Sequence, residues 1–436
     1  MVLIIRANLL YIYTHQKRGL AIMRVQETMR DDGLRIISSR IRSQKVYLGI
    51  MCPVGSAYDP LDMRGLYHYF EHMAFKGTEQ RTVQDLRNFA ARFLLENNAA
   101  TGNLGTIYSG MAVQRKFPEL CEFLCDTYFH SVYPEEEIER EKEVVLNEIE
   151  MRKDNDYSRA YLALGETLWQ KNPLRESGGG TVEGVMKITR SDLLGAHALY
   201  RIPACTVIIA VGAIDHDNVV KTLNTLIPRD ITPCPPRKIW DTEYDMPPTE
   251  QYVTITLPQK QKATIVCGCK FPVHRDKRVR VLRSFLVHML VLGTNSILWN
   301  EIREKRGFAY SVSGGIGGEY SLGNYFFADA SVLPSRVETV CDLIHECIHK
   351  PLSDLRQFEI TQEWLYDWHT LEYETLEDWA GLIMGRLNME LPVKQSERYF
   401  GQIRNLIRSV TLDEVEELRV STLKREKFAT VIVRPE

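Results

Sequence analysis

Two histidines and a glutamate within five residues, His68-Tyr69-Phe70-Glu71-His72, form the first group in the sequence that could carry out chemistry. Residues four apart on a helix share a face, so His68 and His72 could bind one metal ion. Catalytic zinc takes three protein ligands and a water molecule, and a neighbouring carboxylate such as Glu71 can accept a proton from that water. The order H-x-x-E-H is the inverse of the zinc-protease pattern H-E-x-x-H. The segment therefore predicts a metal-dependent hydrolase, with a chance five-residue match as the alternative.

A second acidic segment could supply the third ligand. Glu141 and Glu148 lie seven residues apart in a charged stretch that follows Pro134. Seven residues make about two helical turns, so the two carboxylates share a helix face. One could bind the metal while the other orients a ligand. The alternative is an ordinary solvated helix, and the residues alone leave both interpretations open.

The first segment must also pack against the rest of the protein. At about 100° per residue, Leu66, Tyr69, Phe70 and Met73 fall on the side opposite the two imidazoles. We therefore predict a helix over residues 65–76, with an apolar back toward the core and a metal-binding front.

A later segment, His345-Glu346-Cys347-Ile348-His349, matches the direct order H-E-x-x-H. Its helix has an apolar stripe at helical spacing, and we expect the two histidines to lie beside that stripe, toward solvent. A proline follows two residues after the second histidine and ends the helix. We predict that this match arose by chance and binds no metal.

The order of strand and helix signals predicts the elements that position these groups. With 436 residues, the chain is too long for one ordinary domain. Similar strand and helix patterns recur on both sides of a proline-rich stretch. We predict an α+β protein with two similar domains, each an antiparallel-rich sheet with helices packed on one face. The predicted parts are an N-terminal extension over 1–26, a catalytic domain over 27–228, a linker over 229–248 and a second domain over 249–436.

Composition excludes several classes of protein. Apolar residues make up 44% and charged residues 25% of the chain, as in ordinary globular proteins. A net charge of −3 is poorly suited to neutralising phosphates, so we expect no nucleic-acid partner. No apolar run approaches the roughly 20 residues that span a bilayer, so we expect no membrane span.

The cysteines and the N-terminus bear on the compartment. Nine widely spread cysteines without paired CxxC sets predict buried or free thiols in a reducing compartment, with Cys267 and Cys269 in a strand core. We therefore expect a cytoplasmic protein. The alternative is a mitochondrial one, if residues 1–26, which are basic and lack acidic residues, act as a transit peptide.

The stretch Gly65–Thr78 resembles the signature of the pitrilysin and insulinase family of zinc peptidases. Among its half-length members, which include mitochondrial processing peptidase and its bacterial counterparts, the similarity is strongest. The resemblance implies a zinc metalloendopeptidase that acts on extended peptides or unfolded segments. It implies one Zn²⁺ per chain, bound by His68, His72 and Glu148, with Glu71 as the general base.

Further roles follow from the same resemblance. Glu141 would hold the ligand shell in place. The residues that the family resemblance assigns to substrate binding are Asn98, Ala99, Ala100, Arg303 and Tyr310. The first three resemble the family's active-site edge strand, along which a peptide substrate would add as a further strand.

Three departures from the family pattern stand out. Tyr67 replaces a small residue and could crowd the zinc helix, and the glycine-rich lead-in before Asn98 is absent. The long glycine-rich loop of the non-catalytic processing subunit is missing near residues 292–294, which favours a catalytic chain. The alternative is a non-catalytic structural or regulatory subunit of a processing-peptidase-like complex.

Chain length also bears on assembly. Double-length family members enclose their substrate between two halves, whereas this chain has one half's worth of domains. The resemblance therefore implies a homodimer, or a heterodimer with a degenerate homologue.

Overall fold

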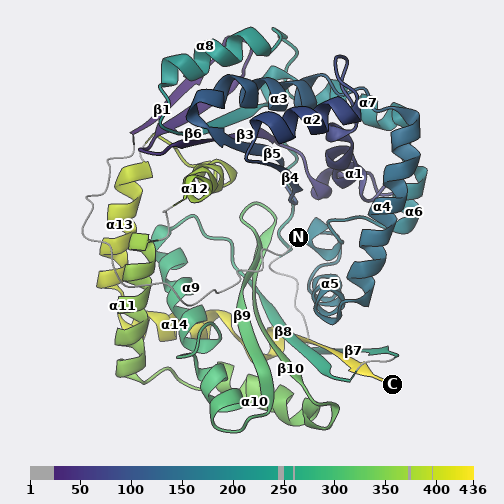
Figure 1. The fold of residues 1–436 in the computed structure, drawn as a ribbon. Helices are drawn as coiled ribbons and strands as arrows, with labels where there is room; N and C mark the ends of the chain where they lie inside the picture. The colour runs from purple at the N-terminus through teal and green to yellow at the C-terminus, as the bar shows by residue number, and fades with distance from the viewer. Residues whose placement is uncertain (1–23, 244–249, 259–260, 372–374, 395) are drawn as a thin grey trace. The chain divides into compact units, whose positions relative to one another are not determined.

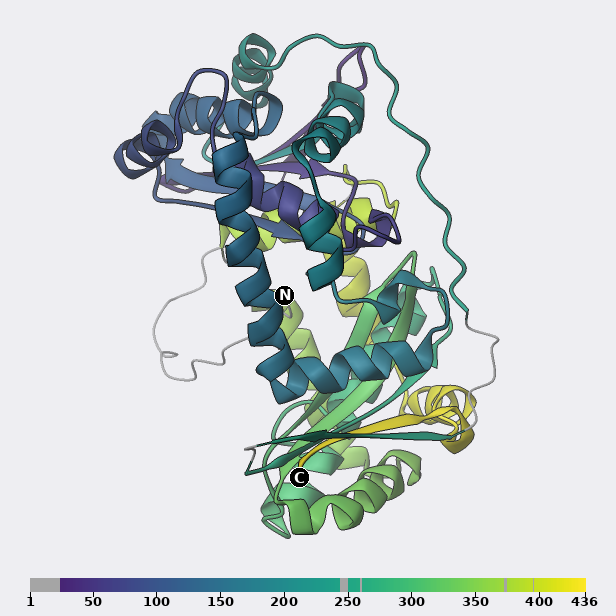
Figure 2. The ribbon, with the colours of Figure 1, turned by 90° about the vertical axis from the view of Figure 1, so that its right-hand side faces the viewer.

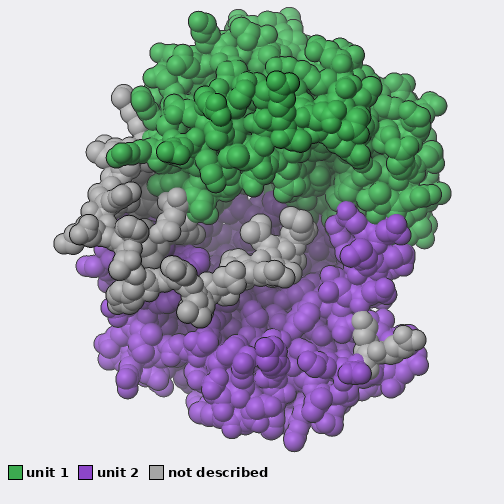
Figure 3. Space-filling view, viewed as in Figure 1, with its two compact units in different colours: residues 1–146, 178–236, 374–397 green, residues 147–177, 237–373, 398–436 purple. Residues whose placement is uncertain are grey.

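The computed structural model describes residues 24–243, 250–258, 261–371, 375–394 and 396–436. Contacts divide the chain into two compact units, each of which is described by itself (Figure 3). Unit 1 comprises residues 1–146, 178–236 and 374–397, and unit 2 comprises residues 147–177, 237–373 and 398–436. The two compact units therefore do not correspond to the two halves of the sequence on either side of the predicted linker. Each unit includes a segment from the other half.

Unit 1 is built on a six-stranded sheet with the order β1-β2-β6-β3-β5-β4. Its strands are β1 (Arg24–Met29), β2 (Arg35–Arg40), β3 (Lys45–Cys52), β4 (Glu96–Thr101), β5 (Thr106–Val113) and β6 (Val207–Gly212). Only the β2–β6 pair is parallel. β4 ends the order, so one of its edges has no strand neighbour among the described residues.

Helices cover both faces of this sheet. Those assigned to unit 1 are α1 (Leu66–His72), α2 (Val83–Phe93), α3 (Phe117–Phe129), α6 (Val182–Lys187), α7 (Arg190–Tyr200), α8 (His216–Leu226) and α12 (Leu376–Asn388). α3 packs on β3 and β5, and α8 packs on β2. On the other face, Ala380 and Ile383 of α12 join a buried cluster with Tyr47, Ile209 and Val211 of the sheet.

Unit 2 contains a five-stranded sheet with the order β7-β11-β8-β10-β9. Its strands are β7 (Gln251–Leu257), β8 (Ala263–Phe271), β9 (Ala309–Glu319), β10 (Gly323–Val332) and β11 (Ala429–Pro435). The one parallel pair is β7–β11. From β7 onward the order repeats that of β2-β6-β3-β5-β4, so the two units share one strand plan and confirm the predicted pair of similar domains.

Helices also cover both faces of the second sheet. They are α5 (Asp156–Leu168), α9 (Lys277–Leu290), α10 (Val337–His349), α11 (Leu355–Leu371), most of α13 (Ser396–Ser409) and α14 (Leu412–Thr422). One face forms the core with α9 and α10. The opposite face packs against Ala160, Ala163 and Leu164 of α5. The prediction placed helices on one face only; here the second face is covered by a helix from the other half of the sequence, as in unit 1.

One long helix, α4 (Glu135–Asp154), leads directly into α5 and is the long blue helix of Figure 2. The charged stretch that follows Pro134 is thus helical. Three glutamates in its first turn suit the positive end of the helix dipole. The division between the units falls inside this helix, after Leu146.

The N-terminal part of the chain differs from the prediction. β1 begins at Arg24 and pairs antiparallel with β2, so the predicted extension overlaps the first three residues of a strand. Residues 1–23 lie outside the described residues. The predicted linker is extended coil over 229–243, and its residues 244–248 also lie outside the described part.

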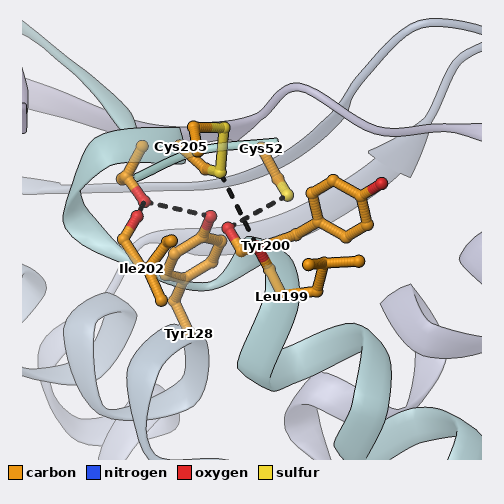
Figure 4. Close-up of a disulfide and its surroundings, with 8 residues drawn as sticks. Cys52, Tyr128, Leu199, Tyr200, Ile202 and Cys205 are labelled. Carbon is orange, nitrogen blue, oxygen red and sulfur yellow. Dashed lines mark hydrogen bonds between the residues drawn. A yellow bond between two sulfur atoms is a disulfide. The ribbon is translucent and has the colours of Figure 1, made fainter. Parts of the chain in front are cut away.

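Cys205 and Cys234 form a disulfide, which corrects the prediction of free thiols throughout (Figure 4). Their Cα atoms are 5.0 Å apart, and the bridge fastens the coil after α8 to the turn before β6. Its partners are 29 residues apart in sequence, and no local spacing pattern signals such a pair. The other seven cysteines are free and buried; Cys267 and Cys269 lie in β8, in the core as predicted.

Among the described residues, none of the helices combines the length and the apolar character that crossing a membrane requires.

The buried carboxyl group of Asp329 on β10, which contacts Tyr161 of α5, makes the stability of unit 2 depend on pH. The Tyr161 hydroxyl donates to Asp329 Oδ2 at 2.8 Å, and Asp329 is 5% exposed. Burial raises the pKa of Asp329 from 3.8 to about 6. The folded state therefore binds this proton more tightly than the unfolded state, and stability falls as pH rises from about 4 to about 6.

We predict that Asp329→Asn stabilises the protein by about 2 kcal/mol near pH 7.5, because the uncharged amide avoids the cost of burying a carboxylate and keeps an acceptor for Tyr161. Near pH 4 the difference should almost vanish. Urea unfolding of both proteins at the two pH values measures this, and an equal effect at both would contradict it.

Candidate metal centre

The short helix α1 carries both histidines, and its first turn is capped from a distance. Gly65 precedes the helix at φ 103°, a conformation that favours glycine. The Asp59 carboxylate accepts hydrogen bonds from the Gly65 amide at 2.7 Å and the Tyr67 amide at 2.9 Å. These bonds satisfy two amides that the helix itself leaves unpaired. Sequence reasoning missed Asp59, because it stands seven residues ahead of the first helical residue, outside the local capping pattern.

The apolar back of α1 is buried as predicted. Leu66, Tyr69, Phe70 and Met73 are each at most 5% exposed. Tyr67 does not crowd the helix, since its ring is also buried and meets the Tyr200 ring edge-on at 5.8 Å. The predicted helix over 65–76 is α1 followed by one 3-10 turn, η2 (Met73–Phe75).

Two polar contacts fix the back of α1. The Tyr69 hydroxyl donates to the Ile138 carbonyl of α4. The guanidinium of Arg201 donates to the Phe70 carbonyl at 3.3 Å and to the Tyr108 hydroxyl at 2.8 Å, and it lies 4.0 Å from the centre of the Phe70 ring. α1 is thus held against α4 and against the core of unit 1.

His68, His72 and Glu148 converge. One ligand atom from each lies within 4.8 Å of the other two, and in the described part of the chain these residues are the group of three that could hold a metal ion. His68 is buried, whereas His72 and Glu148 are half-buried. Two imidazole nitrogens and one carboxylate oxygen form a donor set that suits zinc and leaves a fourth position for water.

Glu141 contacts His72, one of the three possible metal ligands, and Lys76. Its Oε1 lies 2.9 Å from His72 Nδ1, and its Oε2 forms an ion pair with Lys76. With Nδ1 donating to Glu141, the other ring nitrogen of His72 is available as a ligand. Burial opposes the charge of Glu141, but the hydrogen bonds from His72 and Lys76 hold its pKa below the ordinary value. Glu141 and Glu148 both lie on α4 and both approach His72.

Glu71 lies on the same turn of α1 and meets the end of the edge strand. Glu71 Oε2 accepts a hydrogen bond from Thr101 Oγ1 at 2.9 Å, and α1 packs against β4 (Figure 1). Asn98 on β4 is exposed, Ala99 and Ala100 are half-buried, and the Asn98 side chain accepts from the Ala99 amide at 2.9 Å. All five residues lie in unit 1.

A cavity of about 420 Å³ opens between α2 and the start of β4. Its walls are mainly apolar, with Leu86, Ala90 and Phe123 among them, and Lys76 and Glu96 add charge.

Arg303 and Tyr310 belong to unit 2, where they contact each other. Arg303 lies on a turn of π-helix, η6 (Trp299–Glu304), and donates to the backbone carbonyl of Tyr310, the second residue of β9. Its guanidinium lies 4.9 Å from the Tyr310 ring centre and 4.3 Å from that of Trp299. Tyr310 is 76% exposed.

The second histidine pair belongs to the core, which corrects part of the prediction. His345 is only 2% exposed rather than facing solvent, and its Nε2 lies 3.0 Å from Thr430 Oγ1 on β11. His349 Nδ1 donates to the His345 carbonyl at 2.6 Å. Burial and the neighbouring His349 lower the pKa of His345 to about 4. Among the described residues, the group of three that could hold a metal ion is His68, His72 and Glu148, and it does not include this pair.

Comparison with known proteins identifies the class. The model of the insulinase family, peptidase family M16, matches residues 35–181, which include His68, His72 and Glu148. The model of the M16 inactive domain matches residues 187–365. The chain therefore belongs to the M16 peptidase family.

Individual relatives are named as proteases or as a subunit of a peptidase. An uncharacterized zinc protease of Streptomyces coelicolor is 28% identical over 94% of this chain and 89% of its own length. The beta subunit of mitochondrial processing peptidase from Mus musculus is 30% identical over 46% of this chain and 41% of its own. A protease from Helicobacter pylori of known structure has the same fold, with a TM-score of 0.84 over 95% of this chain and all of that one at 18% identity. Family and relatives thus indicate a zinc protease of the M16 type.

We predict that His68→Ala abolishes zinc binding, because one of three ligands is lost. Glu141→Gln should weaken zinc affinity by about 10- to 100-fold, because it disturbs the His72 partner without removing a ligand. Metal analysis after dialysis against zinc buffers measures both.

His345→Gln is the matched control and should keep the zinc content of the unaltered protein. If that variant lost zinc while circular dichroism showed a folded chain, the metal would be bound by His345 and His349, and the assignment to His68 and His72 would be wrong.

Proposed function

We propose that this protein is a zinc metalloendopeptidase that hydrolyses peptide bonds in extended peptides or unfolded segments. The observation that carries the proposal is the convergence of His68, His72 and Glu148, with Glu71 one residue away on the same helix. The second family model bears the word inactive, but it matches residues beyond this cluster.

The chemistry divides between one bound Zn²⁺ per chain and the residues around it. Zinc held by His68, His72 and Glu148 would supply a Lewis acid that lowers the pKa of a water molecule toward about 7. Glu71 accepts a proton from the attacking water and passes it to the departing amine nitrogen. Glu141 holds the His72 ring so that the correct nitrogen faces the metal.

The edge strand β4 offers a place for the substrate backbone. A peptide in extended form can add to an exposed sheet edge through main-chain hydrogen bonds, which read shape more than side chains. We propose Asn98, Ala99 and Ala100 as the strand it pairs with. The cavity beside the start of β4 would receive one substrate side chain, preferably an apolar one given its lining.

Arg303 and Tyr310 complete the proposal as substrate-binding residues. A guanidinium and a phenol can both donate to a peptide carbonyl or to the oxyanion that develops during hydrolysis. The exposure of Tyr310 leaves its hydroxyl accessible for such a role.

A complete enzyme is proposed to contain two chains, a homodimer or a pair with a degenerate homologue. The beta subunit of a processing peptidase among the relatives is, by its name, one subunit of a larger protein. The proposed location remains the cytoplasm, with the mitochondrion as the alternative if residues 1–26 act as a transit peptide. The Cys205–Cys234 disulfide removes the argument from free thiols and is uncommon in a reducing compartment.

We predict that Glu71→Gln retains zinc but loses at least about 100-fold in peptide hydrolysis, because the amide cannot accept the proton. Mass spectrometry of an incubated peptide library gives the products, and metal analysis gives the zinc content. If the unaltered protein binds zinc and cleaves no peptide, the non-catalytic subunit becomes the better description.

We predict that the active species sediments as a dimer of about twice the chain's 50.3 kDa. Analytical ultracentrifugation with activity assays across the fractions tests this. A fully active monomer peak would reject the two-chain proposal and leave the zinc chemistry standing.

A further inference from the structure

We propose that Thr101 is a positioning residue for the Glu71 carboxylate and couples it to the edge strand β4; this inference rests on the proposed peptidase function. The side chain of Thr101 extends from the last residue of β4 to α1, within the same unit. The proposal concerns orientation of the base and assigns Thr101 no contact with the reacting atoms.

The direction of the hydrogen bond follows from counting protons. A threonine hydroxyl has one proton to donate. Thr101 Oγ1 lies 2.9 Å from Glu71 Oε2, but 3.5 Å from both the Tyr67 carbonyl and Thr106 Oγ1. The short contact with the carboxylate therefore takes the proton. Hydrogen bonds to charged acceptors are stronger than neutral ones, which favours the same choice.

The hydroxyl of Thr106, the cross-strand neighbour of Thr101, has a different acceptor. Thr106 is opposite Thr101 in the β4–β5 register and is 1% exposed. Its own hydroxyl donates to the Val54 carbonyl at 2.8 Å. The two hydroxyls thus donate to different partners: Thr106 to the Val54 carbonyl in the loop after β3, and Thr101 to Glu71 on α1.

Backbone hydrogen bonds hold the turn after Thr101 against the loop before α1 and so help to position the donor. The Gly102 carbonyl accepts from the Ser56 amide at 3.1 Å, and the Asn103 carbonyl accepts from the Ala57 amide at 3.0 Å. At Gly55 the two backbones approach so closely that a Cβ atom would lie 2.1 Å from the Gly102 carbonyl oxygen. No residue with a side chain fits there without movement of the backbone.

The acceptor is fixed by the same short segment. Asp59 caps the first turn of α1, and it lies two residues after the part of the loop that holds the β4–β5 turn. Residues 54–59 therefore anchor both the strand that carries Thr101 and the helix that carries Glu71. The hydrogen bond closes this arrangement, and it links the orientation of the base to the strand proposed to receive substrate.

The test compares Thr101→Val, which keeps the shape and removes the hydroxyl, with Thr101→Ser, which keeps the hydroxyl. Thr225→Val, on an exposed site of α8, is the matched control for the same chemical change. The probe is an internally quenched peptide built on a site that the unaltered protein cleaves.

We expect Thr101→Val to retain the zinc content, to keep KM within about threefold, and to lose about 10- to 100-fold in kcat, as misplacement of a catalytic group does. Thr101→Ser and Thr225→Val should keep kcat within about threefold. An unchanged kcat in Thr101→Val, or an equal loss in Thr101→Ser, would overturn the inference.

A second measurement needs no catalysis. In metal-stripped protein, Thr101→Val should lower the urea midpoint in the unaltered background and lower it less in a Glu71→Ala background, since the partner is then gone. Equal shifts in both backgrounds would overturn the contact. If the unaltered protein cleaves nothing but the shifts differ, the proposed function fails while the contact stands.

Discussion

The meeting of three donor atoms from two helices is the constraint on which the rest of this protein depends. His72 and Glu148 are 76 residues apart in sequence, yet their ligand atoms lie within 4.8 Å of each other and of His68. Such a group binds a metal only if neither helix can slide. The Tyr69–Ile138 hydrogen bond and the His72–Glu141 contact join α1 to α4 directly, and the Lys76–Glu141 ion pair joins α4 to the segment just after α1.

The two sheets show how the chain supplies enough apolar surface on both faces. Strands β3 and β8 are buried along almost their whole length, as expected for strands with helices on both sides. In each unit one of the covering helices comes from the other half of the sequence: α12 packs in unit 1 and α5 in unit 2. Each unit therefore depends on the complete chain for its core, although the two units share one strand plan.

The region around Glu71 combines two functions that are separate in the sequence. β4 has an open edge that suits main-chain pairing, and its last residue reaches the carboxylate of Glu71. A loop of six residues, 54–59, holds both partners through backbone contacts and one buried carboxylate. The proposed general base is thus hydrogen-bonded to the strand along which an extended peptide is proposed to lie.

The sequence by itself determined the elements whose signals are local. The spacing of His68 and His72, the apolar back of α1 and the long helix after Pro134 depend on helical periodicity, which neighbouring residues define. Glu141 and Glu148 could be placed on one face for the same reason, but their pairing with the histidines came only through resemblance to a family. Tertiary structure alone decided the Asp59 cap, the Thr101–Glu71 hydrogen bond, the Cys205–Cys234 disulfide and the burial of His345. It also decided that α5 and α12 each pack in the unit formed mainly by the other half of the sequence. Each of these joins residues that are distant or on different elements, and packing of whole sheets and helices, rather than any local pattern, brings them together.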